Sequence, residues 1–229
     1  MVKLWAKTLS TTYNASGAAA AARMGDVVMI VDVIDMSTTA EAALEAGAIS
    51  VLGASPDHLQ VPVTVNPEKI GYYGGKKALK HETGVIIAAE PRLINEENER
   101  LNEIQQVIRG IDRAGAELLV VVPNIGREVV QLTDFAGKVL IIVSPSGGTA
   151  FDAAYNYGAP EVITGTVARI NQKTGNKAAE DAARRAIETA NRLKCGISVV
   201  AASSNSMEDI QAAQYICQLI INQGFLEME

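Results

Sequence analysis

Cysteine, histidine and aromatic residues are scarce in this chain. Its 229 residues include two cysteines and two histidines, and aromatic residues make up 4% of the sequence although 48% of it is hydrophobic. The core must therefore consist mainly of aliphatic side chains. Cys195 and Cys217 lack the short spacing of metal-binding cysteine pairs. We interpret them as buried thiols in a reducing compartment and expect a cytoplasmic protein.

Long apolar runs and an excess of positive charge are also missing. No apolar run approaches the length of a transmembrane helix, and residues 1–7 lack the apolar core of a signal peptide. The formal net charge is −6, whereas nucleic acids and anionic membranes favour basic surfaces. We therefore expect a small-molecule substrate and no nucleic-acid or membrane partner.

Short apolar runs alternate with helical patterns along the whole chain. The apolar runs lie at residues 27–31, 49–53, 85–89, 118–122, 139–143, 161–165 and 197–201. This alternation predicts an α/β fold with a mostly parallel sheet between helical layers, a three-layer α/β/α arrangement. Residues 96–114 are predicted to form one helix.

The sequence predicts a single domain over residues 1–229. The segment 54–96 is the least regular part and is the best candidate for a lid or subdomain. Within it, residues 69–77 are rich in glycine, tyrosine and lysine. They are typical of an exposed loop, either a turn before a helix or a flap over a ligand.

The stretch 27–39 combines a buried strand with polar chemistry. The run VVMIV is followed by Asp32 and Asp35 and then by Ser37, Thr38 and Thr39. Serine and threonine are good N-cap residues, so we expect a helix to start among these three. Ligands bind to open α/β sheets at such strand ends, and helix N-termini favour anions.

Two later segments show the same pattern of an apolar run, then polar residues or glycines, then a predicted helix. Their polar parts lie at residues 144–149 and 203–209. Parallel strands place their carboxyl ends on one edge of a sheet, so the three turns are predicted to converge in one pocket suited to a phosphate or sulfonate. Capping of the following helix is the simpler explanation of each turn taken alone. For the three turns together, the sequence leaves capping and anion binding open.

Carboxylates accompany two of these turns. Asp32 lies at the end of an apolar run, Asp35 follows three residues later, and Glu208 and Asp209 fall in the first turn of the last predicted helix. Together they could hold Mg²⁺, which prefers carboxylates, water and substrate phosphate. The simpler interpretation of Glu208 and Asp209 is interaction with the helix dipole. The sequence contains no nucleophile–base signature.

Several motifs resemble those of the 2-phosphosulfolactate phosphatase family. VDVIDMSTT at 31–39 and ALEAGA at 43–48 resemble the opening Asp-Val-Leu-Arg-Ala-Ser/Thr-Thr-Thr and Ala-Leu-x-x-Gly-Ala motifs of that family. SGGT at 146–149 resembles its Thr-Asn-Gly-Thr turn, EVITGT at 161–166 its strand leading to Gly-Ser, and SMEDIQAA at 206–213 its late Glu-Asp helix start. The resemblance covers about two thirds of the chain.

Enzymes of that family depend on Mg²⁺ and hydrolyse the phosphate ester of sulfolactate on the way to coenzyme M. The resemblance implies an α/β fold, a Mg²⁺ cofactor and a small anionic substrate. It implies that Asp32, Glu208 and Asp209 act as metal ligands or acid–base groups, with Asp35 beside them. The implied anion-binding groups are Ser37, Thr38, Thr39, Ser146, Gly147, Gly148 and Thr149.

The chain departs from the family at charged positions. Asp35 replaces the arginine of the opening motif, Ala150 replaces the arginine after the Gly-Thr turn, and Gly147 replaces its asparagine. The Gly-Asn-Ser-Pro run is not recognisable between residues 61 and 90. Two lost arginines and one new carboxylate change the local charge by about three units, worth a few kcal/mol for each close pair of charges. Three arginines follow predicted strands and would supply replacement charge, although each is more simply a surface residue: Arg92, Arg127 and Arg169.

Three hypotheses follow. The first is a Mg²⁺-dependent phosphatase acting on a small anionic ester. The second is a diverged relative that acts on a less anionic substrate, which Asp35 at the arginine position favours. The third is a non-catalytic ligand-binding or structural homo-oligomer, whose Ala-rich helices would pack between subunits.

Overall fold

The computed structural model describes residues 5–93 and 96–227. In this part of the chain eight strands form two sheets, with the orders β1-β8-β2-β7 and β3-β6-β4-β5, and every strand pair is parallel. The strands are β1 (Leu9–Tyr13), β2 (Val27–Val31), β3 (Ser50–Ala54), β4 (Val85–Ala89), β5 (Leu118–Pro123), β6 (Val139–Val143), β7 (Val162–Gly165) and β8 (Ile197–Ala201).

The helices connect successive strands and cover the sheets. They are α1 (Asn14–Met24), α2 (Met36–Glu45), α3 (Pro67–Lys80), α4 (Glu97–Asn102), α5 (Gln105–Ala114), α6 (Gly147–Asn156), α7 (Lys177–Leu193) and α8 (Met207–Asn222), with a short 3₁₀ helix at Gly126–Gln131. No helix in residues 5–93 and 96–227 is long and apolar enough to cross a membrane.

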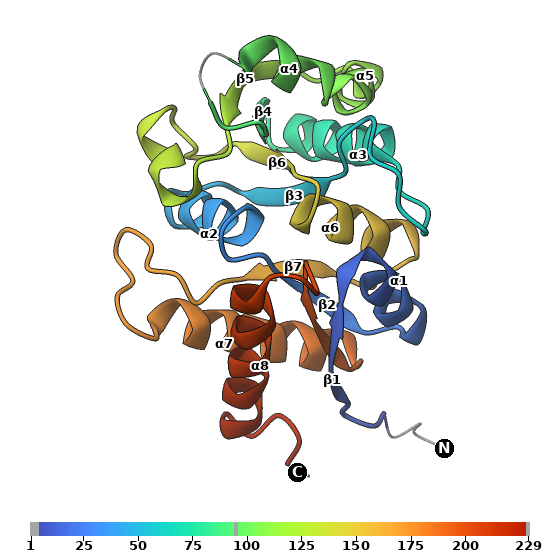
Figure 1. Cartoon of the computed structure of the whole chain (residues 1–229), viewed down its shortest axis with the longest axis vertical. Helices are drawn as coiled ribbons and strands as arrows, with labels where there is room; N and C mark the ends of the chain where they lie inside the picture. Colours follow the sequence, from blue (N-terminus) through green and yellow to red (C-terminus); the bar gives the residue numbers. More distant parts are fainter. Residues whose placement is uncertain (1–4, 94–95, 228–229) are drawn as a thin grey trace.

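Helices lie on both faces of each sheet (Figure 1). Helices α7 and α8 cover the outer face of the first sheet, and α3 and α5 cover the outer face of the second. Helices α1, α2 and α6 lie between the sheets. Helices α2 and α6 contact strands of both sheets, and α1 contacts mainly strands of the first. The predicted α/β class with parallel strands between helical layers is confirmed. The strands divide over two sheets that share the middle helices, whereas the sequence suggested one sheet.

Continuous apolar sequence explains the central strands. Every residue of β2, β4, β6 and β8 is buried, as expected for parallel strands covered by helices on both faces. Fully burying one of their valine or isoleucine side chains stabilises the fold by roughly 1.5–3 kcal/mol. The strand ends that carry polar residues are therefore held by rigid elements.

The expectation of an exposed loop at residues 69–77 is wrong, because this stretch lies inside α3. Its glycines allow α3 and α5 to approach closely. A Cβ atom at Gly71 would lie 2.1 Å from the Val107 carbonyl oxygen, and one at Gly110 would lie 2.1 Å from the Glu68 carbonyl oxygen. Glycine is thus required by helix packing at these positions rather than by a turn.

The irregular segment 54–96 contributes α3 and β4 to the second sheet and its covering layer. A loop at 55–66 connects β3 to α3, and the buried Asp152 carboxylate of α6 accepts the Ser55 and Asn66 N–H groups at 3.2 and 2.7 Å. The predicted helix at 96–114 is interrupted at residues 103–104, between α4 and α5. Residues 1–4 lie outside the described residues.

Candidate functional site

Three helices begin at one cavity. The N-cap residues of α2, α6 and α8 are Asp35, Ser146 and Ser206, and all three line a cavity of about 460 Å³ at the carboxyl ends of the strands. Asp32 and Asp209 line it as well. The predicted convergence of the three turns is therefore found in the structure. A helix N-terminus carries roughly half a positive charge, so three of them make the local backbone favourable to anions.

Asp32 occupies the floor of this cavity, directly after β2, and is 2% exposed. One carboxylate oxygen accepts hydrogen bonds from the Ser146 hydroxyl and the Gly147 N–H, both at 2.7 Å. The other accepts the Asp35 N–H at 3.2 Å. Burial raises the pKa of Asp32, and the hydrogen bonds from Ser146 and Gly147 oppose the shift. Asp32 thus links the end of β2 to the start of α6 and is fixed in position.

Asp209 faces the same cavity from the first turn of α8 and is 3% exposed. Its carboxylate accepts the Val33 N–H at 2.8 Å, while its own N–H donates to the Ser206 hydroxyl at 3.2 Å. Burial raises the pKa of Asp209 to about 6, and the nearby charge of Asp32 adds to the rise. Glu208 is exposed at the rim, where it accepts a hydrogen bond from Ser206.

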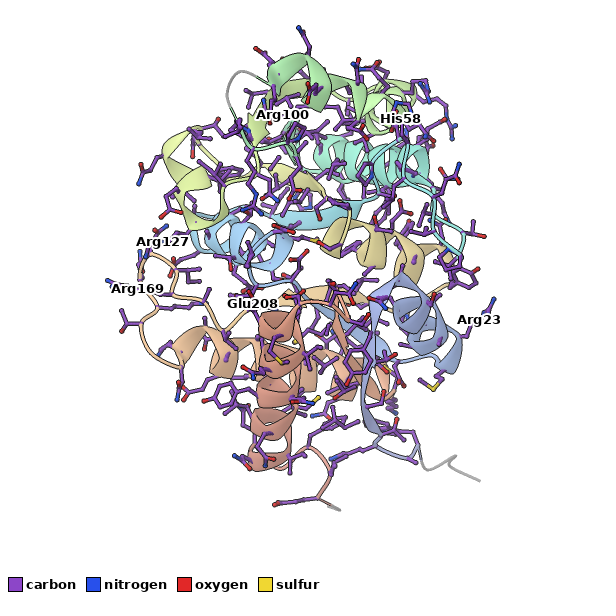
Figure 2. The ribbon with its side chains drawn as sticks, in the orientation of Figure 1. Arg23, His58, Arg100, Arg127, Arg169 and Glu208 are labelled. Atoms are coloured by element: carbon purple, nitrogen blue, oxygen red, sulfur yellow. The ribbon has the colours of Figure 1, made fainter. Side chains whose placement is uncertain are left out.

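Arg92 brings a positive charge to the site. Its guanidinium forms an ion pair with Asp35, donates to the Ile34 carbonyl at 3.3 Å and lies 3.6 Å from Glu90 Oε1. The guanidinium therefore lies beside Asp35, the residue at the arginine position of the resembling motif. Arg169 is an exposed surface residue, as expected, whereas Arg127 is half-buried and pairs with Glu128 at 2.8 Å. Figure 2 shows both toward the edge of the molecule, away from Glu208.

The three hydroxyls after Asp32 lie inside α2, so the expected helix start among them is wrong. The N-cap is Asp35, and the hydroxyls bond to neighbouring elements. Ser37 donates to the Ile30 carbonyl at 3.0 Å and accepts the Asp32 N–H at 2.9 Å. The Thr38 hydroxyl donates to the Val33 carbonyl and forms a hydrogen bond with the Thr166 hydroxyl. The Thr39 hydroxyl donates to Asn124 Oδ1.

The turn before α6 is also held by internal hydrogen bonds. The Gly148 N–H donates to the Ser144 hydroxyl at 2.8 Å, and the Thr149 hydroxyl donates to the Ser144 carbonyl and to Ser55. A Cβ atom at Gly147 would lie 2.4 Å from Asp32 Oδ2, so glycine permits the contact with Asp32. Of the anion-binding residues implied by the motifs, Ser146 lines the cavity of Asp32. The others do not line it: Ser37, Thr38, Thr39, Gly147, Gly148 and Thr149.

Glu90 is a site residue that the motifs did not indicate. It follows β4, and its Oε1 accepts a hydrogen bond from Asn124 Nδ2 at 3.1 Å. Burial raises the pKa of Glu90 to about 7, and the charge of Asp32 contributes to the rise. The rule that singled out Asp32, a carboxylate directly after an apolar strand, also applies to Glu90 and would have found it.

The carboxylates fit Mg²⁺ in their chemistry. Mg²⁺ in proteins is commonly held by one or two carboxylates together with water and substrate phosphate. Asp32 and Asp209 provide two buried carboxylates at one cavity. Across residues 5–93 and 96–227, no three His, Cys, Asp or Glu side chains form a group that could hold a metal ion. The ligand set implied by the motifs, Asp32, Glu208 and Asp209, therefore does not form such a group.

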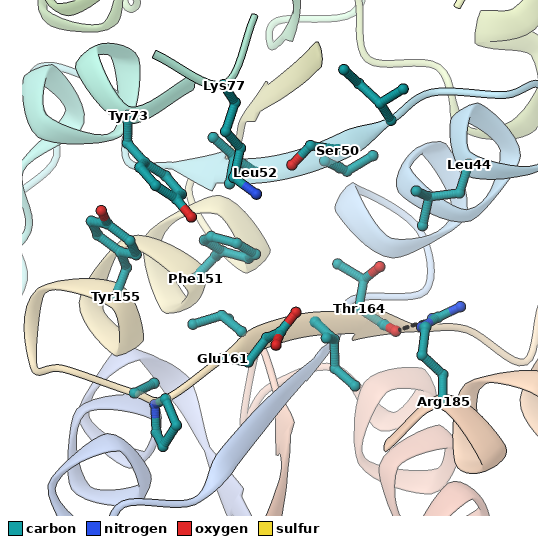
Figure 3. A pocket seen from close by; sticks show the side chains of 16 residues that line it. Leu44, Ser50, Leu52, Tyr73, Lys77, Phe151, Tyr155, Glu161, Thr164 and Arg185 are labelled. Carbon is teal, nitrogen blue, oxygen red and sulfur yellow. Dashed lines mark hydrogen bonds between the residues drawn. The ribbon is translucent and has the colours of Figure 1, made fainter. Parts of the chain in front are cut away.

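A separate cavity of about 360 Å³ lies between β3 and β7, the facing edges of the two sheets (Figure 3). Figure 3 shows Tyr73, Lys77 and Phe151 around it, with Arg185 donating to the Thr164 carbonyl. None of the predicted catalytic, metal-binding or anion-binding residues lines this cavity, although Leu44 and residues 161–164 of two motifs do.

The chain matches no protein-family model, and no curated protein matches it. The resemblance to the 2-phosphosulfolactate phosphatases stays a prediction from the motifs. Function must be argued from the site itself.

Proposed function

We propose that the chain is a Mg²⁺-dependent hydrolase that removes phosphate from a small ester at the cavity of Asp32. The observation that carries the proposal is the position of Asp32. This buried carboxylate lies where the N-termini of α2, α6 and α8 meet, beside the buried carboxylate of Asp209.

The electrostatics of the cavity support the combination of a cation with an anionic substrate. Three helix N-termini and Arg92 favour a phosphate group. The four carboxylates of Asp32, Asp35, Glu208 and Asp209 line the same cavity and oppose it. A divalent cation held by Asp32 and Asp209 would offset this repulsion, and it would supply Lewis-acid polarisation of the phosphoryl oxygens.

The chain's own residues would then bind and orient the substrate. The Ser146 hydroxyl at the cavity wall donates to Asp32 and lies 3.3 Å from Asp35 Oδ2, so it is placed to contact a phosphoryl oxygen by exchanging one of these partners. Arg92 would exchange Asp35 for the anion in the same way. The hydrogen bonds from Gly147 and Asp35 to Asp32 keep its carboxylate in one orientation, which lowers the cost of ordering the site.

A less anionic substrate is the second candidate. The observation that favours it is the pairing of Arg92 with Asp35, which neutralises the guanidinium that the phosphatase proposal needs. A cationic or neutral substrate would leave this ion pair intact.

We also infer a cytoplasmic location, because Cys195 and Cys217 are both free thiols.

The test is phosphate release by the purified chain from a panel of monoesters that includes phosphosulfolactate, with Mg²⁺ and with chelator. The proposal expects Mg²⁺-dependent release from at least one ester. Release that is unchanged by chelator would contradict the role of Mg²⁺. No release from any ester would instead favour the second candidate, and amine-containing and neutral substrates should then be assayed.

A further inference from the structure

Glu90 lines a second cavity beside that of Asp32. This cavity has a volume of about 650 Å³, and its walls include Pro56, Leu59 and Pro91. Pro145 lines both this cavity and that of Asp32, and Arg92 lies against Asp35 of the first and Glu90 of the second, so the two cavities are neighbours. The two cavities differ in character, because the first is lined mainly by polar and acidic groups and the second has apolar walls with an acidic rim.

We propose that Glu90 is the general acid of the hydrolase and that the alcohol part of the ester occupies the second cavity. This inference rests on the proposed phosphatase function and assigns a role and a substrate class to it. Glu90 lines the second cavity, and Arg92 joins it to Asp35 of the first; the proposal places the bond between phosphorus and the ester oxygen within reach of Glu90.

The orientation of Glu90 is set by a chain of hydrogen bonds. The Thr39 hydroxyl donates to Asn124 Oδ1 at 2.6 Å, which leaves the Asn124 amide group to donate to Glu90 Oε1 at 3.1 Å. Asn124 is fully buried, so this arrangement is held by packing as well. Thr39 and Asn124 are therefore positioning residues for Glu90.

The groups around Glu90 favour a carboxyl group that can hold a proton near neutral pH. Burial and the charge of Asp32 raise its pKa to about 7, whereas the hydrogen bond from Asn124 lowers it. Arg92 faces Glu90 from the loop after β4 at 3.6 Å. The other charged or titratable residues lining the second cavity are His58, Glu99 and Glu103. A general acid works best when its pKa lies near the operating pH.

The proposed step balances in atoms and charge. The oxygen of a water molecule forms a bond to phosphorus, and the bond from phosphorus to the ester oxygen breaks. The electron pair of that bond stays on the leaving oxygen, which takes the proton of Glu90 and departs as an alcohol. Glu90 is left as a carboxylate. The attacking water releases a proton, and Glu90 is protonated again by it. The net reaction is ester plus water to alcohol plus phosphate.

The walls of the second cavity indicate the class of alcohol. Proline and leucine side chains suit an alkyl group, and Glu99 and Glu103 at the rim would repel a second anion. We therefore expect monoesters of neutral alkyl alcohols to be better substrates than esters whose alcohol carries carboxylate or sulfonate groups.

The test compares wild type with Glu90→Gln on two esters in the presence of Mg²⁺. Butyl phosphate has a poor leaving group that needs protonation, whereas 4-nitrophenyl phosphate has a good one that does not. The variant should lose about 10²-fold or more in kcat on butyl phosphate and much less on 4-nitrophenyl phosphate. The wild-type rate on butyl phosphate should fall as the pH rises through about 7, and the variant should lose this fall.

Glu117→Gln is the matched control, because Glu117 is exposed before β5 at the opposite end of the second sheet. It should match wild type on both esters. Equal losses of Glu90→Gln on both esters, or an unchanged rate and pH profile on butyl phosphate, would overturn the general-acid role while leaving the phosphatase function standing. Failure of the wild type to hydrolyse either ester would overturn the phosphatase function itself, and this inference with it.

Discussion

At the scale of single residues, buried charge determines how this fold is held and how its site works. Asp32, Asp209 and Glu41 are each at most 3% exposed. A buried carboxylate is tolerated when it is paired, hydrogen-bonded or protonated. Asp32 and Asp209 rely on backbone N–H donors and on raised pKa values, whereas Glu41 relies on a full partner, Arg185.

Replacement of Arg185 tests that distinction. Arg185 extends from α7, pairs with Glu41 of α2 at 2.6 Å and donates to the Thr164 carbonyl at 2.6 Å. Arg185→Met should leave the Glu41 charge buried without its partner and lower the free energy of unfolding by about 3 kcal/mol, measured by denaturant melts. Arg184→Met is the control, because Arg184 is 60% exposed and forms surface ion pairs, and its melting curve should match wild type. Equal melts for the two variants would show that the buried pair does not stabilise the fold.

At the scale of elements, apolar runs predicted the strands well because parallel strands between helical layers are buried along their whole length. The same reasoning failed for α3. Residues 69–77 contain glycines that suggest a turn, but the reason for glycine at Gly71 and Gly75 is the approach of α5, which lies far along the sequence. A local pattern cannot report such a contact.

The packing of α3 on α5 leads to a direct prediction. Alanine has a higher helix propensity than glycine by about 1 kcal/mol, so propensity alone predicts that Gly110→Ala stabilises α5. A Cβ atom there would lie 2.1 Å from the Glu68 carbonyl oxygen, so we expect a net destabilisation of about 1–3 kcal/mol in thermal or denaturant melts. Asp112→Ala, on the exposed side of α5, should be neutral or stabilising. A stabilised Gly110→Ala protein would contradict the close helix crossing.

At the scale of the whole molecule, the sequence supports the class of fold better than the arrangement of the sheets. Strand type follows from local burial, but the pairing of β3 with β6 rather than with β2 depends on contacts between distant segments. The turn after β6 belongs to the second sheet, so its place at the cavity of Asp32 did not follow from the sequence. The convergence of the turns after β2 and β8 was predictable, because these strands are parallel neighbours in one sheet. The inward bonds of Ser37, Thr38 and Thr39 were not, since they depend on which strand lies beside α2.

The clustered carboxylates should make the stability of the whole protein depend on pH. The pKa of Glu90 rises from 4.5 to about 7 on folding, so between these values the folded state binds a proton that the unfolded state releases. Stability should therefore be highest at the acidic end of this range and fall as the pH rises toward 7, by up to about 3 kcal/mol from this group. Asp209, with a pKa of about 6, acts in the same direction.

Glu90→Gln isolates this contribution. Denaturant melts between pH 5 and pH 8 should show a smaller loss of stability for the variant than for wild type, because glutamine does not titrate. Glu117→Gln should follow wild type over the same range. Parallel curves for wild type and Glu90→Gln would mean that Glu90 ionises in the folded protein as it does in the unfolded chain.

The most direct measurement of the central claim is the rate of Mg²⁺-dependent phosphate release by wild type, Asp32→Asn and Asp112→Asn on the best ester of the panel. Asparagine keeps the size of the side chain and removes the charge beneath the three helix N-termini. We predict that Asp32→Asn stays folded and loses at least about 10³-fold in kcat/KM, a loss of about 4 kcal/mol in transition-state stabilisation. Asp112→Asn, which changes an exposed carboxylate on α5, should keep the wild-type rate. A folded Asp32→Asn protein that releases phosphate at the wild-type rate would contradict the claim that this cavity is the active site.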